Sequence, residues 1–264
     1  MSTVATSPLH IESVGTGAPI VLLHGWGLHG GLFAPLLPAL SAFHRVHAVD
    51  LPGHGHAGPL RPWTIAGCVA ALEEAFASSQ QPLVVLGWSL GGLVAMEWAL
   101  RHPTRIARLL LVSATPKFVA DASWHCATSA QTLDRFADEL RVAYRPTLQR
   151  FLALQVRDGE AGKATLALMR QRLFERGEPD AAALAQALAV LRTHDLRAWV
   201  PALRPPVLVI AGDRDTLVPP AASHWLARSL PHAELCEIAG AAHAPFLSHR
   251  EQFERAVDAF LHRA

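Results

Sequence analysis

The apolar run Leu83-Val84-Val85-Leu86 is followed at once by Gly87-Trp88-Ser89-Leu90-Gly91 and then by a helical stretch from Leu93 to Leu100. The chain must therefore turn from a strand into a helix within a few residues, and glycines at 87 and 91 let the backbone pack closely around a strained Ser89. A G-x-S-x-G motif in this setting predicts a nucleophile elbow, which holds the serine at the amino end of a helix, where backbone N–H groups favour negative charge. The alternative is an ordinary glycine-rich turn.

Short runs rich in leucine and β-branched residues recur along the chain with helical stretches between them, a pattern typical of a mostly parallel sheet with helices on both faces. We predict strands near residues 20–23, 46–49, 83–86, 109–112, 207–211 and 235–238. The alternation stops between about Pro116 and Trp199, where only helical periodicity is seen. We therefore expect an α/β core of residues 1–115 and 200–264 with a helical insertion of residues 116–199. Its place after a core strand puts it over the carboxyl edge of the sheet, as a lid above Ser89 or as a plain extra helical layer.

Composition excludes several classes of protein. The chain is 51% hydrophobic and 17% charged, as globular proteins are, and no apolar run reaches the roughly 18 residues that span a bilayer. Residues 1–9 lack the basic and apolar parts of a secretory signal, so we expect a cytoplasmic protein. The three cysteines, Cys68, Cys126 and Cys236, fit reduced and mostly buried thiols. His54 and His56 lie in a Pro-Gly turn without a set of ligand spacing, and we expect no metal.

Two later segments can supply the partners that a serine nucleophile needs, a base and a carboxylate that orients it. The predicted strand at 207–211 runs into Gly212-Asp213-Arg214-Asp215, and Asp215 is our candidate for the acid, with Asp213 as the alternative. The strand ending at Ile238 leads into a loop that carries His243, the candidate base. The order serine, acid, histidine is that of α/β-hydrolases.

Acyl transfer also needs two donors for an oxyanion. One is expected to be the backbone N–H of Leu90, the residue after the serine. The other should come from the loop His24-Gly25-Trp26-Gly27 after the first predicted strand, with the Trp26 backbone as donor. The Trp26 indole forms either a pocket wall or core packing, and His24 is expected to brace the loop rather than to act in catalysis.

The middle of the insertion is basic: between Arg141 and Arg176 there are eight Lys or Arg residues against three acidic ones, whereas the whole chain carries a net charge of +1. Such a run is either a solvated face or a surface that steers an acidic partner.

Taken together, the loop His24–Gly27, the turn Asp50–Gly55, the elbow, Asp215 and His243 resemble those of an α/β-hydrolase across the whole chain. The stretches around Trp26, Ser89 and His243, and above all Phe151-Leu152-Ala153-Leu154-Gln155 in the insertion, are similar to the family of pimeloyl-[acyl-carrier protein] methyl ester esterases of biotin synthesis.

This resemblance implies a cytoplasmic, monomeric serine carboxylesterase that needs no cofactor and removes a methyl group from a pimeloyl chain attached to acyl-carrier protein. Ser89, Asp215 and His243 would form the triad, and Trp26 and Leu90 the oxyanion site. Residues 151–155 would join them and His243 in binding the acyl chain. Arg150 matches a carrier-facing arginine of the family. A second arginine expected four residues earlier is replaced by Pro146, so the residues that could substitute are Arg145, Arg157 and Lys163.

Four other functions compete with this reading, and the residues disfavour three of them. A general carboxylesterase or carbon–carbon bond hydrolase on the same fold would act on a small free substrate. A non-catalytic receptor on the same scaffold is disfavoured because all three triad residue types stand in order. A haloalkane dehalogenase would need aspartate at the elbow, and nucleic-acid binding is disfavoured by the low net charge and the lack of a known motif.

Overall fold

Within the residues that the computed structural model describes, 7–156 and 159–263, seven strands form one sheet. The spatial order is β1-β3-β2-β4-β5-β6-β7, with β1 antiparallel to β3 and all other neighbours parallel. The strands are β1 (His10–Val14), β2 (Ala18–Leu23), β3 (His44–Asp50), β4 (Leu83–Trp88), β5 (Ile106–Val112), β6 (Val207–Gly212) and β7 (Ala233–Ile238). The expected α/β-hydrolase fold with a mostly parallel sheet is confirmed.

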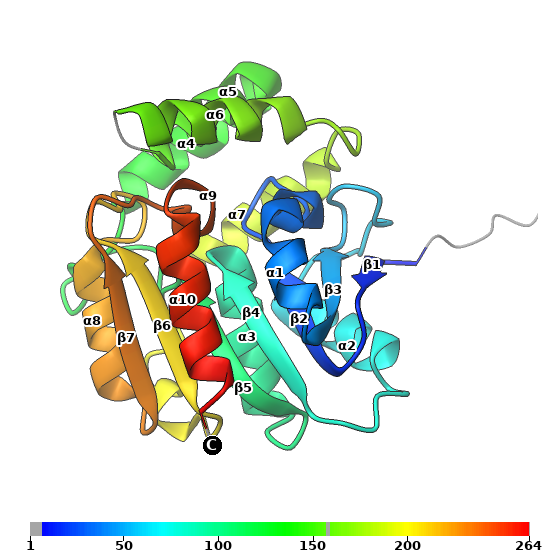
Figure 1. The fold of residues 1–264 in the computed structure, drawn as a ribbon. Helices are drawn as coiled ribbons and strands as arrows, with labels where there is room; N and C mark the ends of the chain where they lie inside the picture. The colour runs from blue at the N-terminus through cyan, green and yellow to red at the C-terminus, as the bar shows by residue number, and fades with distance from the viewer. Residues whose placement is uncertain (1–6, 157–158, 264) are drawn as a thin grey trace, which may run out of the picture.

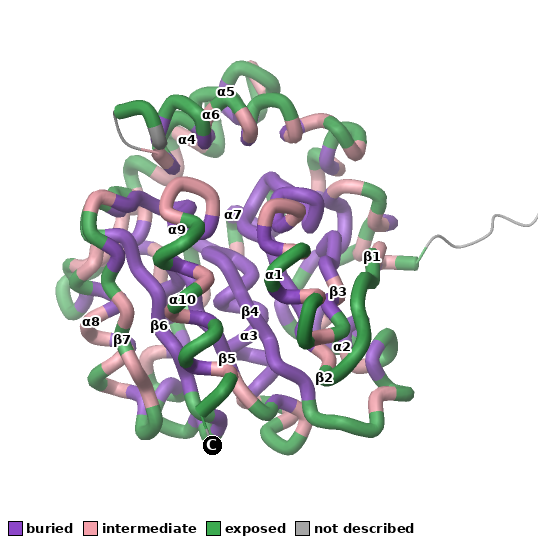
Figure 2. The backbone as a smooth tube through the Cα atoms, in the orientation of Figure 1, coloured by how far each residue is buried: buried purple, intermediate pink, exposed green. Residues whose placement is uncertain are grey.

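All six predicted strands are present, each somewhat longer than its apolar run. The central strands β4 and β6 are buried along their whole length, as strands covered on both faces must be (Figure 2). The edge strand β1 was missed. Its sequence, HIESV, has no apolar run, because every residue of the strand is half-buried or exposed.

Helices cover both faces of the sheet (Figure 1). On one face lie α1 (Leu37–Ser41) and α10 (Arg250–Leu261), and on the other α2 (Ile65–Ala75), α3 (Leu90–Arg101) and α8 (Pro220–Ser229). The 3-10 helix η1 (Gly30–Leu36) precedes α1, and α9 (Pro245–Ser248) precedes α10. No helix in the described part of the chain is long and apolar enough to cross a membrane.

Four further helices lie between β5 and β6 and stand over the carboxyl ends of the parallel strands (Figure 1). They are α4 (Ala130–Val142), α5 (Tyr144–Leu154), α6 (Glu160–Arg172) and α7 (Ala181–Thr193), and the short 3-10 helix η2 (Val200–Ala202) leads back into the core. We call residues 116–199 the insertion. That it forms a lid distinct from a core of residues 1–115 and 200–264 stays a prediction.

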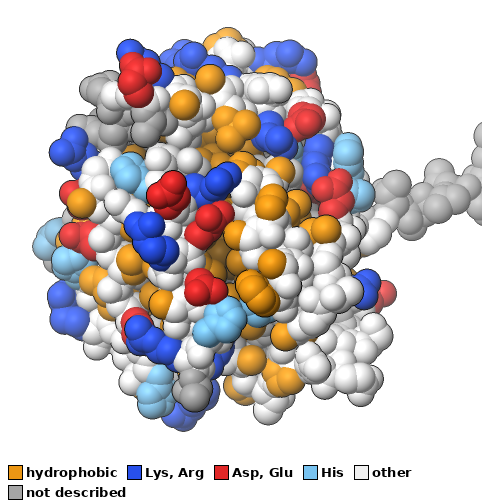
Figure 3. Space-filling view, in the orientation of Figure 1, with side chains coloured by type: hydrophobic (Ala, Val, Ile, Leu, Met, Phe, Trp, Pro, Cys, Tyr) orange, Lys and Arg blue, Asp and Glu red, His pale blue; other side chains and the backbone are white. Residues whose placement is uncertain are grey.

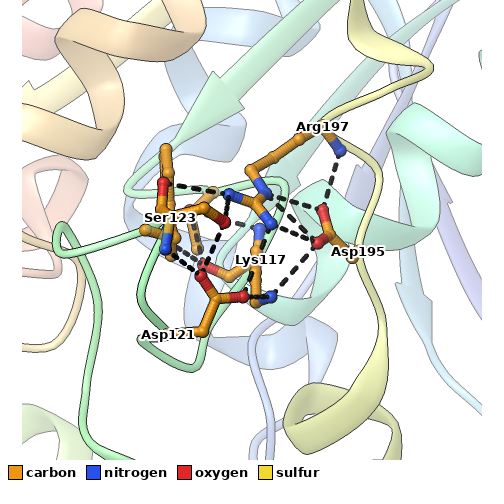
Figure 4. A network of polar contacts seen from close by, with 7 residues as sticks. Lys117, Asp121, Ser123, Asp195 and Arg197 are labelled. Atoms are coloured by element: carbon orange, nitrogen blue, oxygen red, sulfur yellow. Dashed lines mark hydrogen bonds and ion pairs between the residues drawn. The ribbon is translucent and has the colours of Figure 1, made fainter.

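The two ends of the insertion are joined by a cluster of ion pairs (Figure 4). Lys117, just after the insertion begins, contacts Asp121 and, at 3.2 Å, Asp195 near the end of the insertion. Arg197 pairs with Asp195 at 2.7 Å and bonds both the carbonyl and the hydroxyl of Ser123. The outgoing and returning chain are thus fixed to each other at the sheet edge.

Candidate active site

Ser89 lies between β4 and α3 with φ 56° and ψ −116°, a backbone conformation that residues with a Cβ rarely adopt. Its flanking glycines are required by close backbone contacts. A Cβ on Gly87 would lie 2.4 Å from the Gly91 carbonyl oxygen, and one on Gly91 would lie 2.2 Å from the Leu23 carbonyl oxygen. The turn therefore has the geometry that the motif predicts, with a strained serine at the end of the central strand.

His243 and Asp215 form a buried pair, with Nδ1 of the imidazole 2.8 Å from Oδ2 of the carboxylate. The other carboxylate oxygen, Oδ1, accepts hydrogen bonds from the backbone N–H groups of Leu217 and Val218, at 2.9 and 3.0 Å. A carboxylate only accepts, so the Nδ1 of His243 carries the proton, and Nε2 is left as the basic atom.

Asp213, the alternative acid, has a structural contact instead of a contact with His243. Its carboxylate accepts a 2.7 Å hydrogen bond from the backbone N–H of Gly240 and so braces the loop that leads to His243. Of the two aspartates, Asp215 is the one in contact with the histidine.

The backbone N–H groups of Leu90 and Trp26, both near Ser89, have no hydrogen-bond partner among the described residues. Leu90 is the first residue of α3, where the N–H groups have no partner inside the helix. Trp26 follows Gly25, on which a Cβ would lie 3.3 Å from the Cβ of Ser89, so this loop packs directly against the serine. Unpaired N–H groups in this position can receive a developing negative charge.

Ser89, His243 and Trp26 line one cavity of about 270 Å³ between the sheet edge and the insertion. Of the predicted acyl-binding residues, Phe151 and Leu154 line this cavity as well. Leu152 is buried and does not line it, and Ala153 is exposed. Gln155 is buried, and its side-chain Nε2 has no hydrogen-bond partner.

Several lining residues were not identified as site residues from the sequence. They are Phe136, Leu188 and Leu191, whose apolar side chains fit the helical periodicity of the insertion, together with Phe118, Thr128, Thr132, Leu133, Thr216 and Leu217. Apolar side chains make most of the wall of this cavity, so it suits a hydrocarbon chain next to a small reactive group.

The Trp26 side chain both lines the cavity and ties the core to the insertion. Its ring meets those of Phe136 and Phe151 edge-on, with centroids 5.3 and 5.4 Å apart. Its indole N–H donates a 3.0 Å hydrogen bond to the Leu184 carbonyl of α7. The two alternatives for this side chain, pocket wall and packing, are thus both realised.

The described residues of the predicted docking set, Arg145, Arg150 and Lys163, are exposed, and each has an acidic partner. Arg150 lies 2.6 Å from Glu139, Arg145 contacts Glu178 and the face of Phe174, and Lys163 lies 3.1 Å from Glu160. Arg157 lies outside the described residues. Lys and Arg side chains edge the top of the molecule in Figure 3, above hydrophobic side chains gathered between the insertion and the core.

Arg176 belongs to the same basic run but not to this surface. Only 9% of its side chain is exposed, and its guanidinium bonds both oxygens of the fully buried Asp50 at 3.1 Å and also contacts Glu12. Arg176 thus anchors the insertion to the core.

The three cysteines are free; Cys68 is buried, and Cys126 and Cys236 are half-buried. One set of possible metal ligands occurs among the described residues: His10, Glu12 and His56, with ligand atoms within 4.8 Å of one another. The spacing of these residues in the sequence did not indicate such a set, because β1 and the turn after β3 come together only in the folded protein. Glu12 already pairs with Arg176, and none of the three lines the Ser89 cavity.

Comparison with known proteins identifies the family of the chain. A family model for the α/β hydrolase fold matches residues 18–250. The pimeloyl-[acyl-carrier protein] methyl ester esterase of Chromobacterium violaceum is 44% identical over 249 residues, which cover 94% of this chain and 96% of the relative. The protein of the same name from Xanthomonas axonopodis pv. citri is 43% identical, with 96% and 98% covered.

Solved structures give the same fold. An esterase from Exiguobacterium antarcticum superposes with a TM-score of 0.90 at 20% identity, covering 97% of this chain and 96% of that one. A hydrolase from Pseudomonas aeruginosa superposes with a TM-score of 0.84 at 28% identity, covering 99% and 98%.

Proposed function

The chain belongs to the α/β hydrolase family and, within it, to the pimeloyl-[acyl-carrier protein] methyl ester esterases, and we propose that it hydrolyses the methyl ester of pimeloyl-[acyl-carrier protein] in biotin biosynthesis. The observation that carries the chemistry is that Ser89 and the Asp215-bound His243 line one apolar cavity beside two unpaired backbone N–H groups. The substrate follows from the relatives, which match this chain over nearly its whole length.

The reaction has two acyl-transfer steps. The Ser89 hydroxyl attacks the ester carbonyl carbon while His243 Nε2 takes its proton, and Asp215 stabilises the imidazolium through the Nδ1–H bond. The carbonyl oxygen becomes an oxyanion that accepts from the N–H groups of Leu90 and Trp26, each worth about 3 kcal/mol in the transition state.

The intermediate then collapses. The bond from carbon to the methoxy oxygen breaks, and His243 returns the proton to it, so methanol leaves and an acyl-Ser89 ester remains. A water molecule gives a proton to His243 and attacks the acyl carbon. Collapse of the second tetrahedral intermediate releases the carboxylic acid and restores the Ser89 hydroxyl. Every proton passes through one histidine, so no cofactor is required.

The cavity would hold the pimeloyl chain. Phe151 and Leu154 supply apolar wall, and Leu152 packs behind them in the core. Gln155 lies in the same segment, and its buried Nε2 has no hydrogen-bond partner, but the residue does not line the cavity and is assigned to acyl binding by the resemblance alone. Ala153 is exposed and does not line the cavity, so it too is assigned to this segment by the resemblance alone.

The carrier protein would dock on the insertion, which then serves as both lid and recognition surface. Arg150, Arg145 and Lys163 are exposed there, and Arg157 belongs to the same proposed surface. Because Arg150, Arg145 and Lys163 already pair with acidic residues of the insertion, an acidic carrier would replace these ion pairs with its own. Such contacts govern encounter and specificity more than affinity.

The free thiols Cys68, Cys126 and Cys236 support a reducing compartment, and we place the enzyme in the cytoplasm as a monomer.

Steady-state hydrolysis of pimeloyl-[acyl-carrier protein] methyl ester, measured beside a short free methyl ester, tests the proposal. We expect a much higher kcat/KM for the carrier-linked ester, and loss of both activities in Ser89→Ala. If the wild type prefers the free ester, the general carboxylesterase is the right function. If Ser89→Ala keeps its activity, the triad is wrong.

A further inference from the structure

His24 is buried completely between the end of β2 and the turn after β3, and both of its ring nitrogens are hydrogen-bonded. Nδ1 lies 2.8 Å from the carbonyl oxygen of Gly25, and Nε2 lies 2.9 Å from the backbone nitrogen of Leu51. The ring therefore connects the loop that packs against Ser89 to the end of the neighbouring strand.

These two partners fix the tautomer. A backbone N–H can only donate, so Leu51 requires a lone pair on Nε2. The proton of the neutral ring is then on Nδ1, where it donates to Gly25. Burial, with the neighbouring His54 next in effect, lowers the pKa of His24 to about 3, so the ring stays in this neutral form.

The Gly25 carbonyl and the Trp26 N–H belong to one planar, trans peptide unit, in which the two groups point in opposite directions. A hydrogen bond that holds the carbonyl therefore also aims the N–H. We infer that His24 is a positioning residue for the oxyanion site: by donating to Gly25, it turns the Trp26 N–H toward the reacting carbonyl at Ser89. This inference rests on the proposed function of Trp26.

The surroundings of this peptide support the inference. The Trp26 N–H has no partner among the described residues, so nothing else holds it in place. The only other donor to the Gly25 carbonyl in the described chain is the N–H of Leu28, at 3.3 Å, which is long for such a bond. A Cβ on Gly25 would lie 3.3 Å from Ser89 Cβ, so this peptide begins at a residue that packs directly against the nucleophile.

Two substitutions separate the two bonds. In His24→Asn the amide N–H₂ takes the place of Nδ1 and keeps the bond to Gly25, but the bond to Leu51 is lost. In His24→Gln the amide oxygen takes the place of Nε2 and keeps the bond to Leu51, but the bond to Gly25 is lost. Each variant loses one buried hydrogen bond, so a merely structural role for His24 predicts equal effects on activity.

The readout is the rate at which a fluorophosphonate labels Ser89, because the adduct places an oxygen in the oxyanion site whatever the natural substrate is. We expect His24→Gln to be labelled about tenfold more slowly than His24→Asn at equal folded fraction, with kcat for a free ester falling likewise and KM little changed. Equal labelling rates would overturn the inference. A wild type that does not label would overturn the proposed function and this inference with it, whereas a wrong natural substrate leaves the comparison unaffected.

The wild type gives a second test if His24→Gln does not fold. Long-range proton–nitrogen NMR spectra report the tautomer of His24, assigned by its absence in His24→Asn. We expect protonated Nδ1 and unprotonated Nε2. The opposite tautomer cannot donate to Gly25 and would refute the inference.

Discussion

The indole N–H of Trp88 donates a 2.8 Å hydrogen bond to the backbone carbonyl of His243. Trp88 is fully buried, its ring centroid lies 5.9 Å from that of His243, and its other neighbour is Phe246, just beyond the histidine. The residue before the proposed nucleophile thus holds the loop that carries the proposed base. The bond from Trp88, at the end of β4, helps to fix the separation of Ser89 and His243, and the bond from Asp215 holds the His243 ring from the loop after β6.

Replacing Trp88 by Phe should lower kcat about tenfold with little change in KM. The ring packing is largely kept, but the His243 carbonyl loses its donor, at a cost of about 1–3 kcal/mol in stability. Trp98→Phe is the matched control, because Trp98 is also fully buried and its indole bonds a side chain, Glu73, away from the cavity. Urea unfolding should show a similar loss of stability in both variants, and ester hydrolysis a loss in Trp88→Phe alone. An equal fall in kcat would make the effect one of general stability.

The charge of the insertion should act on carrier-linked substrate only. Arg150→Glu should raise KM for the carrier-linked ester about tenfold. Glu139→Gln, which removes the partner 2.6 Å from Arg150, should lower this KM. Both effects should shrink at high salt, because these groups are exposed.

Arg228→Glu, at an exposed position near the end of α8, is the charge-matched control and should leave KM for both esters unchanged. If Arg150→Glu slows the free ester as much as the carrier-linked one, the docking surface lies elsewhere.

Stability should fall as the pH drops below about 6.5. The pKa of His24 is lowered to about 3 by burial and by His54, and the pKa of His54 to about 4, chiefly by burial. Between the pKa values in the folded protein and the ordinary value of about 6.5, the unfolded chain therefore binds more protons than the folded one. The stability that the neutral rings confer is complete above pH 6.5 and is lost as the pH falls.

Each histidine contributes a slope of about 1 kcal/mol per pH unit in this range. Urea unfolding between pH 6.5 and 5 measures it, above the range where carboxylates titrate. His24→Asn should remove about one proton from the uptake on unfolding and so flatten the slope. A slope that is the same in wild type and His24→Asn would mean that His24 is not buried as a neutral ring.

The sequence could predict the parts of this protein that local chemistry dictates. The elbow, the acid loop and the histidine loop each follow a buried apolar strand, and parallel strands bring their carboxyl ends to one edge, so Ser89, Asp215 and His243 had to lie near one another. The choice of Asp215 over Asp213 rested on position, and the contact with His243 agrees with it.

Features that depend on contacts between distant segments could not be predicted. The edge strand β1 exists because its backbone pairs with β3, not because of its side chains. In the sequence Arg176 is one of eight basic residues in a run, and nothing there indicates its ion pair with Asp50, 126 residues earlier in the chain. The cavity wall likewise comes from residues such as Thr128 and Thr216, which are far apart in the chain and lie together only in the folded protein.

The strained backbone of Ser89 leads to a final prediction. A Cβ at φ 56°, ψ −116° costs about 1–3 kcal/mol, and Ser89→Ala keeps this cost while Ser89→Gly removes it. Both variants should be inactive and resist fluorophosphonate labelling, but Ser89→Gly should be the more stable in urea by about 1 kcal/mol or more. Ser223, buried within the helix α8, gives the matched control, since there the glycine variant should be less stable than the alanine variant by about 1 kcal/mol. If glycine is more stable than alanine at position 89 but less stable at position 223, the folded protein stores strain at its nucleophile. If glycine is the less stable residue at both positions, the elbow is relaxed.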